Sequence, residues 1–419
     1  NGDVEHVVSR LAVAGKLLGD RRKGSLLGAV QDRAVLNFGE AVADLAGVRT
    51  GLVSQDPAER LPPGLKNKLA AHFRIADGLD PQQIADAVRG LARQIGPPHR
   101  LIGALEQLQV PLGEVRDALG IEGMGAEVAK NFRDKARMKT VLQRAGVPCA
   151  RHQRVTSDAE AWSFVDSAGY PVVLKPTSGA GAKSTFRVAD AGEMRAALAS
   201  VRPSEGRQAV VEEFVVGDEF SFDTVSIRGR PVWHSLSYYL PAPLNVVDNP
   251  WIQWCVLIPR EIDHPRFDDI RRVAFRALEV LGMGTGLSHM EWFRKPDGSV
   301  LVSEVGARPP GAQITSLISY AHDIDFYRAW ARLVVKDEFD PPAHKYAAGG
   351  AYLRGQGQGR VKAVHGLAAV QRDLGGLIVE AKLPQIGQPQ ASSYEGEGYI
   401  LFRHPETAVV EEALRRTIS

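Results

Sequence analysis

Cysteine is almost absent from this chain, and neither charge sign is in excess. Only Cys149 and Cys255 occur among 419 residues, which excludes a disulfide framework and a cysteine-based zinc site. Both are expected to be buried thiols. The chain has 51 Lys and Arg against 49 Asp and Glu. The composition therefore shows no excess of positive charge of the kind that binds nucleic acid or an anionic membrane.

Long apolar runs are missing as well. No run of about 18 apolar residues and no signal-peptide apolar region is found, so we expect a cytoplasmic protein. No internal repeat at a fixed period occurs either. The 44% apolar content is typical of a globular chain, and its length suggests roughly two to four domains.

Three units are expected along the chain. Residues 1–130 are assigned to an N-terminal parallel α/β domain, because from about residue 34 short β-rich runs alternate with helical runs. Residues 1 to about 30 have helix-like apolar spacing, and the sequence assigns them no function. Strands, hairpin turns and helices mix in residues 131–345, which predicts an α+β domain. A β-rich C-terminal domain, residues 346–419, is expected to pack on it.

Two glutamates are predicted to face each other across a hairpin. Asp297 and Gly298 suit a two-residue type I′ turn, and the register that follows puts Glu291 directly opposite Glu304. Their Cβ atoms would then lie about 4.5 to 5.5 Å apart, and like charges at that separation repel. A divalent cation between hard oxygen ligands is the simplest way to offset the repulsion. Arg308 would lie on the same face of its strand as Glu304.

A short apolar strand that ends at Lys175 is followed by a loop of small residues. Small residues let backbone N–H groups approach phosphate oxygens, and the lysines at either end of the loop supply positive charge. The alternative is an ordinary glycine-rich turn, since neither a GxxxxGK[ST] P-loop nor a dinucleotide fingerprint is present. The candidate phosphate-binding residues are Lys175, Ser178, Gly179, Gly181, Lys183 and Ser184.

A second apolar strand, broken by acidic residues, begins about thirty residues later. Glu212 and Glu219 are candidates to bind ribose hydroxyls, and the backbone of Glu213, Phe214 and Val215 is a candidate to pair with an adenine edge. The alternative is that these acids are merely solvated at the end of a strand.

Together these segments resemble the ATP-grasp superfamily, from roughly residue 100 to 345 and in the order of the family's motifs. The resemblance implies an ATP-grasp fold with a small lid subdomain at about 150–215, and ATP and Mg²⁺ as cofactors. By this resemblance Lys135 and Lys175 would bind ATP, and residues 178–185 would form a mobile flap over the phosphates. Glu212 and Glu219 would contact the nucleotide, with Phe214-Val215 as the adenine hinge. Glu291 and Glu304 would be the magnesium carboxylates, and Arg308 would contact phosphate or the acyl group.

One position departs from the family pattern. The family commonly has Glu-x-Asn-x-Arg, in which the asparagine is a further magnesium ligand, whereas this chain has Gly306 at that place. The predicted register sets Gly306 opposite His289. The His289 ring is therefore either a replacement ligand or substrate contact, or a histidine satisfied within the sheet. The number of bound metal ions is left open.

The resemblance implies an ADP-forming ligase in which a carboxylate attacks the γ-phosphate of ATP and an amine captures the acyl phosphate. Lys183 and Arg308 would stabilise the phosphoryl group as it passes. The stretch around Arg308 and the His-x-Glu at 289–291 are most similar to L-amino-acid ligases that make dipeptides, which assigns His289, Arg308 and Gly311 to the amino-acid substrates. Its partners would be small molecules, and a homodimer is the default assembly.

Two other interpretations stay open. The domain order also resembles biotin carboxylase and purine-pathway ligases, although no Ala-Met-Lys-Met-like biotinylation site occurs. A nucleotide-binding module without catalysis would agree with Gly306, but not with the retained glutamates, lysines and Arg308.

Overall fold

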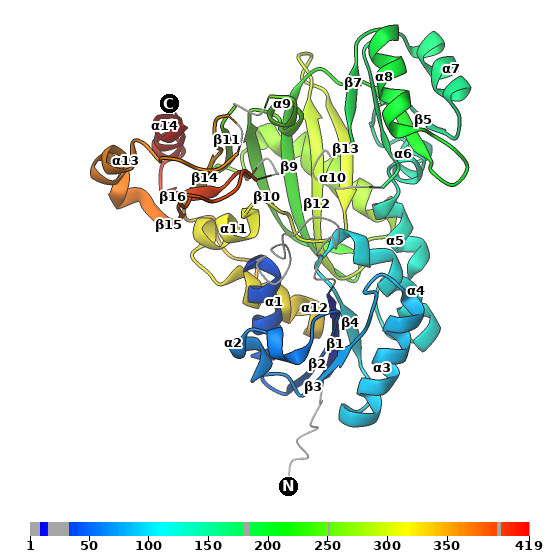
Figure 1. Cartoon of the computed structure of the whole chain (residues 1–419), viewed down its shortest axis with the longest axis vertical. Coiled ribbons are helices and arrows are strands. Elements are labelled where there is room, and N and C mark those ends of the chain that lie inside the picture. The colour runs from blue at the N-terminus through cyan, green and yellow to red at the C-terminus, as the bar shows by residue number, and fades with distance from the viewer. Residues whose placement is uncertain are drawn as a thin grey trace.

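The computed structural model describes residues 9–15, 33–178, 184–249, 252–357, 359–391 and 395–418. The strands in these ranges form three sheets (Figure 1). No helix within the described ranges is long and apolar enough to cross a bilayer. Cys255 is buried as expected, whereas Cys149 is only partly buried.

The first sheet is parallel, in the order β3–β2–β1–β4, which confirms the predicted parallel α/β architecture. Asp80 begins the longest helix here, because its side chain accepts from the N–H groups of Gln82 and Gln83. The elements are β1 (Ser9–Gly15), α1 (Arg33–Ala43), β2 (Val48–Ser54), η1 (Ala58–Arg60), α2 (Pro63–Lys66), β3 (Ala71–Arg74), α3 (Pro81–Ile95), β4 (Arg100–Ile102), η2 (Glu106–Leu108) and α4 (Gln109–Leu119).

Strand β1 corrects the sequence interpretation of the first thirty residues. Its segment carries helix-like spacing, yet it lies as a strand between β2 and β4. A strand with parallel neighbours on both sides is usually a continuous apolar run, and a short run of that kind does not distinguish strand from helix.

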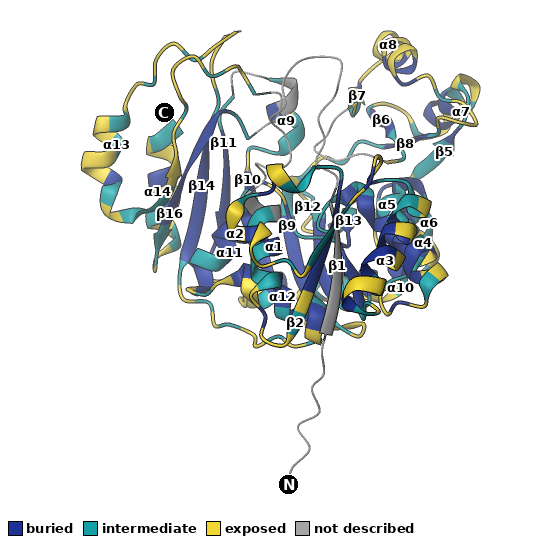
Figure 2. Cartoon of the chain, turned by 60° about the horizontal axis from the view of Figure 1, so that its bottom comes forward, coloured by how far each residue is buried: buried dark blue, intermediate teal, exposed yellow. Residues whose placement is uncertain are grey.

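The second sheet is small and antiparallel, in the order β5–β8–β6–β7. Its two helices expose much of their surface (Figure 2). The elements are β5 (His152–Val155), α7 (Asp158–Ala168), β6 (Val172–Pro176), β7 (Phe186–Val188), α8 (Ala191–Val201) and β8 (Ala209–Glu213).

The third sheet has eight antiparallel strands in the order β13–β12–β9–β10–β11–β14–β16–β15. Its strands are β9 (Asp218–Ile227), β10 (Arg230–Leu240), β11 (Trp254–Ile258), β12 (Gly286–Arg294), β13 (Val300–Gly306), β14 (Ala347–Leu353), β15 (Ile378–Lys382) and β16 (Gly398–His404). The accompanying helices are α5 (Ala126–Arg133), α6 (Lys135–Arg144), α9 (Pro243–Asp248), η3 (Pro265–Phe267), α10 (Asp268–Leu281), α11 (Ile314–His322), α12 (Phe326–Lys336), α13 (Leu367–Leu374), η4 (Gly375–Leu377) and α14 (Thr407–Ile418).

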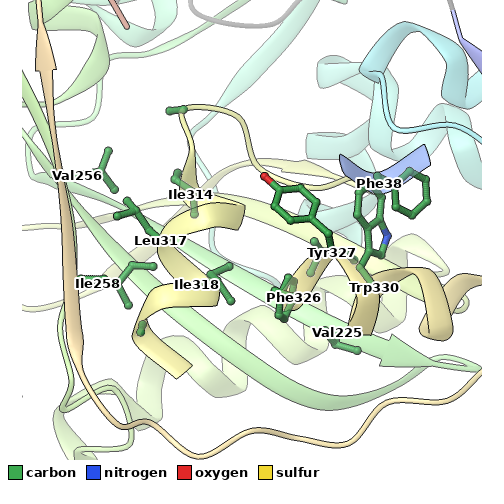
Figure 3. Close-up of a cluster of buried hydrophobic side chains, with 14 of the residues drawn as sticks. Phe38, Val225, Val256, Ile258, Ile314, Leu317, Ile318, Phe326, Tyr327 and Trp330 are labelled. Carbon is green, nitrogen blue, oxygen red and sulfur yellow. The ribbon is translucent and has the colours of Figure 1, made fainter. Parts of the chain in front are cut away.

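Alternate residues of the large sheet enter two different cores. On one face, Met290 and Trp292 pack in a cluster that includes α10 and α6. On the other face, Val225 packs with α11 and α12, where Phe38 from α1 stacks on Trp330 with ring centroids 3.5 Å apart (Figure 3). Burying one large apolar side chain stabilises the fold by about 1.5–3 kcal/mol. Side chains alternate along a strand, so Glu291 lies on the same face as α11 and α12.

Candidate functional site

Strands β12 and β13 place Glu291 directly opposite Glu304, as predicted. The predicted two-residue type I′ turn is wrong, however. Lys295 N–H donates to the Ser299 carbonyl and Gly298 N–H donates to the Lys295 carbonyl, each at 2.9 Å. Gly298 takes a φ of 82°. The loop therefore has three residues and combines a turn with a left-handed glycine.

Two one-residue deviations cancel along this hairpin. The longer turn pairs Arg294 with Val300, one residue short of the predicted register. A β-bulge next to Glu291 then leaves Ser303 as an extra residue in β13 and brings Glu304 opposite Glu291. Bulges often re-aim side chains beside active sites. The facing carboxylates depend on the turn and the bulge together.

Helix α6 supplies partners to the backbone of β13, an edge strand of the large sheet. Met138 Sδ accepts from the N–H of Val305 at 3.2 Å. Lys139 Nζ donates to the carbonyl of Ser303 at 2.9 Å. These contacts satisfy backbone groups at and beyond the bulge, so α6 stabilises the geometry that aligns the carboxylates.

Glu212 lies between two buried lysines. Its Oε1 is 2.5 Å from Lys175 Nζ and its Oε2 is 3.1 Å from Lys139 Nζ. Burial opposes ionisation of Glu212, but Lys139 and Lys175 outweigh it and lower its pKa to about 2. Burial likewise disfavours the charged form of Lys175, but Glu212 outweighs it and raises the lysine's pKa. Sequence reasoning missed Lys139; its signal is the four-residue spacing from Lys135, which puts both on one helix face.

Three carboxylates meet beside these lysines. Burial, with the charge of Glu291, raises the pKa of Glu219 well above its ordinary value, and burial, with Glu304, raises that of Glu291. Burial alone would raise the pKa of Glu304 as well. The positive charges of Lys135, which forms an ion pair with Glu304, and of Lys175 outweigh burial, so the pKa of Glu304 is lowered. The charged forms of Glu219 and Glu291 are therefore disfavoured here, whereas that of Glu304 is favoured by the lysines, and a cation beside Glu219 and Glu291 would relieve the repulsion.

This donor set fits magnesium bound together with phosphates. Within the part of the chain that the structure describes, no group of three or more His, Cys, Asp or Glu side chains forms a metal cage. Magnesium usually takes one or two carboxylates and completes its shell with waters and phosphate oxygens. Glu291 and Glu304 supply that number, and their mutual repulsion favours a cation.

His289 is held within the sheet at both ring nitrogens. Its Nδ1 lies 2.8 Å from Oδ1 of the fully buried Asp223, and its Nε2 lies 3.3 Å from the hydroxyl of Tyr239. The Nε2 atom is 4.0 Å from a carboxylate oxygen of Glu291. His289 pairs with Gly306 across the hairpin, as predicted. The two hydrogen bonds favour a positioned histidine over a metal ligand.

Arg308 follows β13 and reaches toward the first sheet. Its Nε donates to the carboxylate of Glu106, a residue of η2 that lies 202 positions away in the chain. Its Nη1 donates to the carbonyl of Pro309 at 2.8 Å. Arg308 is close enough to Glu304 to act on its charge. Gly311 is exposed on the loop that follows.

The predicted phosphate loop joins β6 to β7, which pair as neighbouring antiparallel strands. Ser178 and Ser184 belong to this loop and are exposed. Gly179, Gly181 and Lys183 lie outside the described residues. The strand pairing thus fixes where the loop begins and ends, on the sheet that carries Lys175.

The predicted adenine-binding segment, residues 213–215, begins at the end of β8. Arg151 Nε donates to a carboxylate oxygen of Glu213 at 2.6 Å. The N–H of Glu213 donates to the carbonyl of Arg151 at 3.0 Å, and the N–H of Phe214 donates to the carbonyl of Pro171 at 3.2 Å. These two N–H groups are used within the protein, so an adenine edge would pair with other backbone groups here.

Comparison with known proteins supports the sequence resemblance. Residues 140–319 match the ATP-grasp domain family. The L-arginine-specific L-amino acid ligase of Bacillus subtilis is 23% identical over 266 residues, which are 62% of this chain and 63% of that protein. A D-alanine–D-alanine ligase of Stutzerimonas stutzeri is 25% identical over 201 residues, 48% of this chain and 62% of that ligase. The matches thus span less than two thirds of these relatives.

Solved structures share the whole fold. An L-amino acid ligase from Bacillus licheniformis superposes with a TM-score of 0.75 at 21% identity, and the match covers 97% of this chain and 96% of that one. N5-carboxyaminoimidazole ribonucleotide synthetase from Thermotoga maritima gives a TM-score of 0.67 at 18% identity, over 98% and 97% of the two chains. At these identities the likeness establishes the fold.

Proposed function

Because residues 140–319 match the ATP-grasp domain family, we propose that this protein is an ADP-forming ligase that joins two amino acids through an amide bond. The carboxylate of the first amino acid attacks the γ-phosphate of ATP, which forms an acyl phosphate and releases ADP. The amine of the second attacks the acyl carbon, loses a proton and displaces phosphate. The amino-acid ligases among the relatives support this substrate class.

The observation that carries the proposal is the pairing of Glu291 with Glu304 beside Lys135 and Lys175. These two glutamates would hold magnesium, which neutralises phosphate charge and stabilises the transferring group. A pair of partly buried like charges is costly to fold. Its presence next to two lysines is explained by a ligand that carries both a cation and phosphates.

The chain's own residues would position the reactants. Glu212 holds the ammonium of Lys175 in place before a nucleotide binds, so little reorganisation is needed when it meets phosphate oxygens. Lys183 and the loop at 178–185 would cover the phosphates, and Glu219 would bind the ribose. Arg308 would bind the carboxylate and then the acyl phosphate, with His289 and Gly311 on the amino-acid side. Catalysis by positioning and charge needs no nucleophilic side chain.

The surrounding organisation belongs to the same proposal. The small sheet would act as the lid at about 150–215, between an N-terminal domain at 1–130 and a C-terminal domain at 346–419. We propose small-molecule substrates, a cytoplasmic location and a homodimeric assembly, and no nucleic-acid or membrane partner. The balanced charge of the chain supports the proposed absence of a nucleic-acid or membrane partner.

The test is an ADP and phosphate release assay with ATP, magnesium and a panel of amino-acid pairs. Productive pairs should release both products and yield a dipeptide that mass spectrometry detects. Glu304→Ala should abolish turnover without loss of the fold. Release of AMP and pyrophosphate would contradict the acyl-phosphate route. ADP release with bicarbonate and no amino acid would favour carboxylation, and bound ATP without turnover would favour a non-catalytic module.

A further inference from the structure

Gly306 is a position where a side chain would be crowded by two neighbouring side chains. Its φ is not among the left-handed values of the chain, so backbone conformation does not require glycine here. A Cβ atom at this position would lie 3.3 Å from Oε2 of Glu106 and 3.3 Å from Cγ of Arg308. Both separations are shorter than ordinary van der Waals contact, so Glu106 and Arg308 would have to shift by a few tenths of an ångström to admit even a Cβ atom. The space next to Gly306 is therefore filled by the Glu106–Arg308 pair.

Glu106 reaches this space from the N-terminal part of the chain. It opens η2 just after β4 and is 8% exposed. One carboxylate oxygen accepts from Arg308 Nε, and the other lies 3.9 Å from Nη1 of Arg133, the last residue of α5. A buried carboxylate between two guanidinium groups is held in one orientation.

We infer that Glu106 is a positioning residue that orients Arg308 toward the reacting carboxyl group. Position 306 is then a glycine because a side chain there would displace the Glu106 carboxylate. This rests on the proposed function and deepens it, because it assigns the alignment of the amino-acid carboxylate to a contact between the first sheet and the large sheet. Arginine binds carboxylates through a planar fork, so a rotation of its guanidinium would cost binding and rate together.

The inference also accounts for the family's missing asparagine. A carboxylate oxygen of Glu106 lies only 3.3 Å from the place that a Cβ atom at position 306 would take. Because Arg308 neutralises it, Glu106 acts on the arginine and not as a third metal ligand. Introducing asparagine at 306 would push Glu106 away from Arg308 and would have the same effect as removing its carboxylate.

Steady-state kinetics of four variants test this: Glu106→Ala, Glu106→Gln, Gly306→Asn and the double variant Glu106→Ala/Gly306→Asn. Glu106→Ala should lower kcat/KM for the carboxylate-donating amino acid about ten- to a hundredfold, the loss expected for a charged hydrogen bond, with KM for ATP unchanged. Glu106→Gln keeps an acceptor and should lose less. Gly306→Asn should match Glu106→Ala, and the double variant should be no worse than either.

The control is Glu122→Gln, since Glu122 pairs with Arg100 instead of a site residue; its kinetics should match wild type. The inference would be overturned if the loss of kcat/KM in the double variant were the product of the losses in the two single variants. It would also be overturned if KM for ATP rose as much as kcat/KM for the amino acid fell. If wild type turns over no amino-acid pair, the proposed function falls. The urea unfolding energies of the same variants then decide: independent, additive destabilisation by Glu106→Ala and Gly306→Asn would show that the two residues do not share this space.

Discussion

Lys139 donates to the carbonyl of Ser303, the extra residue of β13 whose bulge brings Glu304 opposite Glu291. The same ammonium lies 3.1 Å from Glu212. One buried lysine therefore connects the carboxylate that holds Lys175 to the strand geometry that sets Glu291 opposite Glu304. The residues proposed to bind nucleotide and those proposed to bind metal are thus built as one unit.

Replacing Lys139 with methionine should destabilise the protein strongly. The change leaves a carboxylate oxygen of Glu212 and the Ser303 carbonyl without this donor, and breaking a buried ion pair costs about 3–5 kcal/mol. Urea unfolding followed by circular dichroism measures the loss. Lys68→Met is the control, since Lys68 pairs with Asp44 at 2.7 Å near the surface and should matter little. A loss for Lys139→Met no larger than for Lys68→Met would contradict this.

The facing glutamates could be predicted from sequence because side chains alternate along strands and turn residues mark the reversal. The prediction reached the correct pair through an incorrect turn, since the bulge at Ser303 made up the difference. That bulge is supported by Lys139 from α6. Such a contact depends on packing between distant segments, which one sequence does not reveal.

The contact between Glu106 and Arg308 likewise could not be predicted from the sequence. The parallel sheet around it follows from alternating strand and helix patterns, but nothing in Leu105-Glu106-Gln107 indicates a site. The pairing with Arg308 arises only when η2 is brought against the end of β13. By contrast, Gly306 was visible as a departure from the family pattern, although its cause was not.

Glu291→Gln and Glu304→Gln should shift stability in opposite directions in the absence of magnesium and nucleotide. Burial and the charge of Glu304 raise the pKa of Glu291, so neutralising it should stabilise the fold. Glu304 forms an ion pair with Lys135, so its amide should destabilise. Thermal melts of both variants, with wild type as reference, provide the measurement. Shifts of the same sign would show that the two carboxylates are equivalent.

His289→Asn should lower activity without changing the magnesium concentration that gives half-maximal turnover. The reason is that both ring nitrogens bond within the protein, to Asp223 and Tyr239. Tyr239→Phe, which removes one of those bonds, serves as the matched variant, and magnesium titrations of ADP release provide the measurement. A several-fold rise in the magnesium requirement for His289→Asn alone would instead identify the ring as a ligand.

Two neighbouring histidines, the buried His322 and the partly buried His344, hold opposite tautomers. Nδ1 of His322 donates to the carbonyl of Ile318 at 2.8 Å, so its Nε2 carries a lone pair. That lone pair accepts from Nε2 of His344 at 3.3 Å. Burial, together with the neighbouring His344, lowers the pKa of His322 to about 4, and burial lowers that of His344 to about 4. Both rings are therefore neutral in the folded protein at neutral pH.

The free energy of unfolding should fall as the pH drops from 6.5 toward 4. The unfolded chain binds protons at histidine near the ordinary value of 6.5, whereas folded His322 and His344 resist protonation until about 4. The unfolded state then carries more protons in this window, and each such histidine contributes a slope of up to about 1.4 kcal/mol per pH unit. Urea unfolding at several pH values should show a shallower slope for His344→Gln than for wild type. His365→Gln, at an exposed position, should leave the slope unchanged. Equal slopes for wild type and both variants would show that the His322–His344 pair is not what responds to acid.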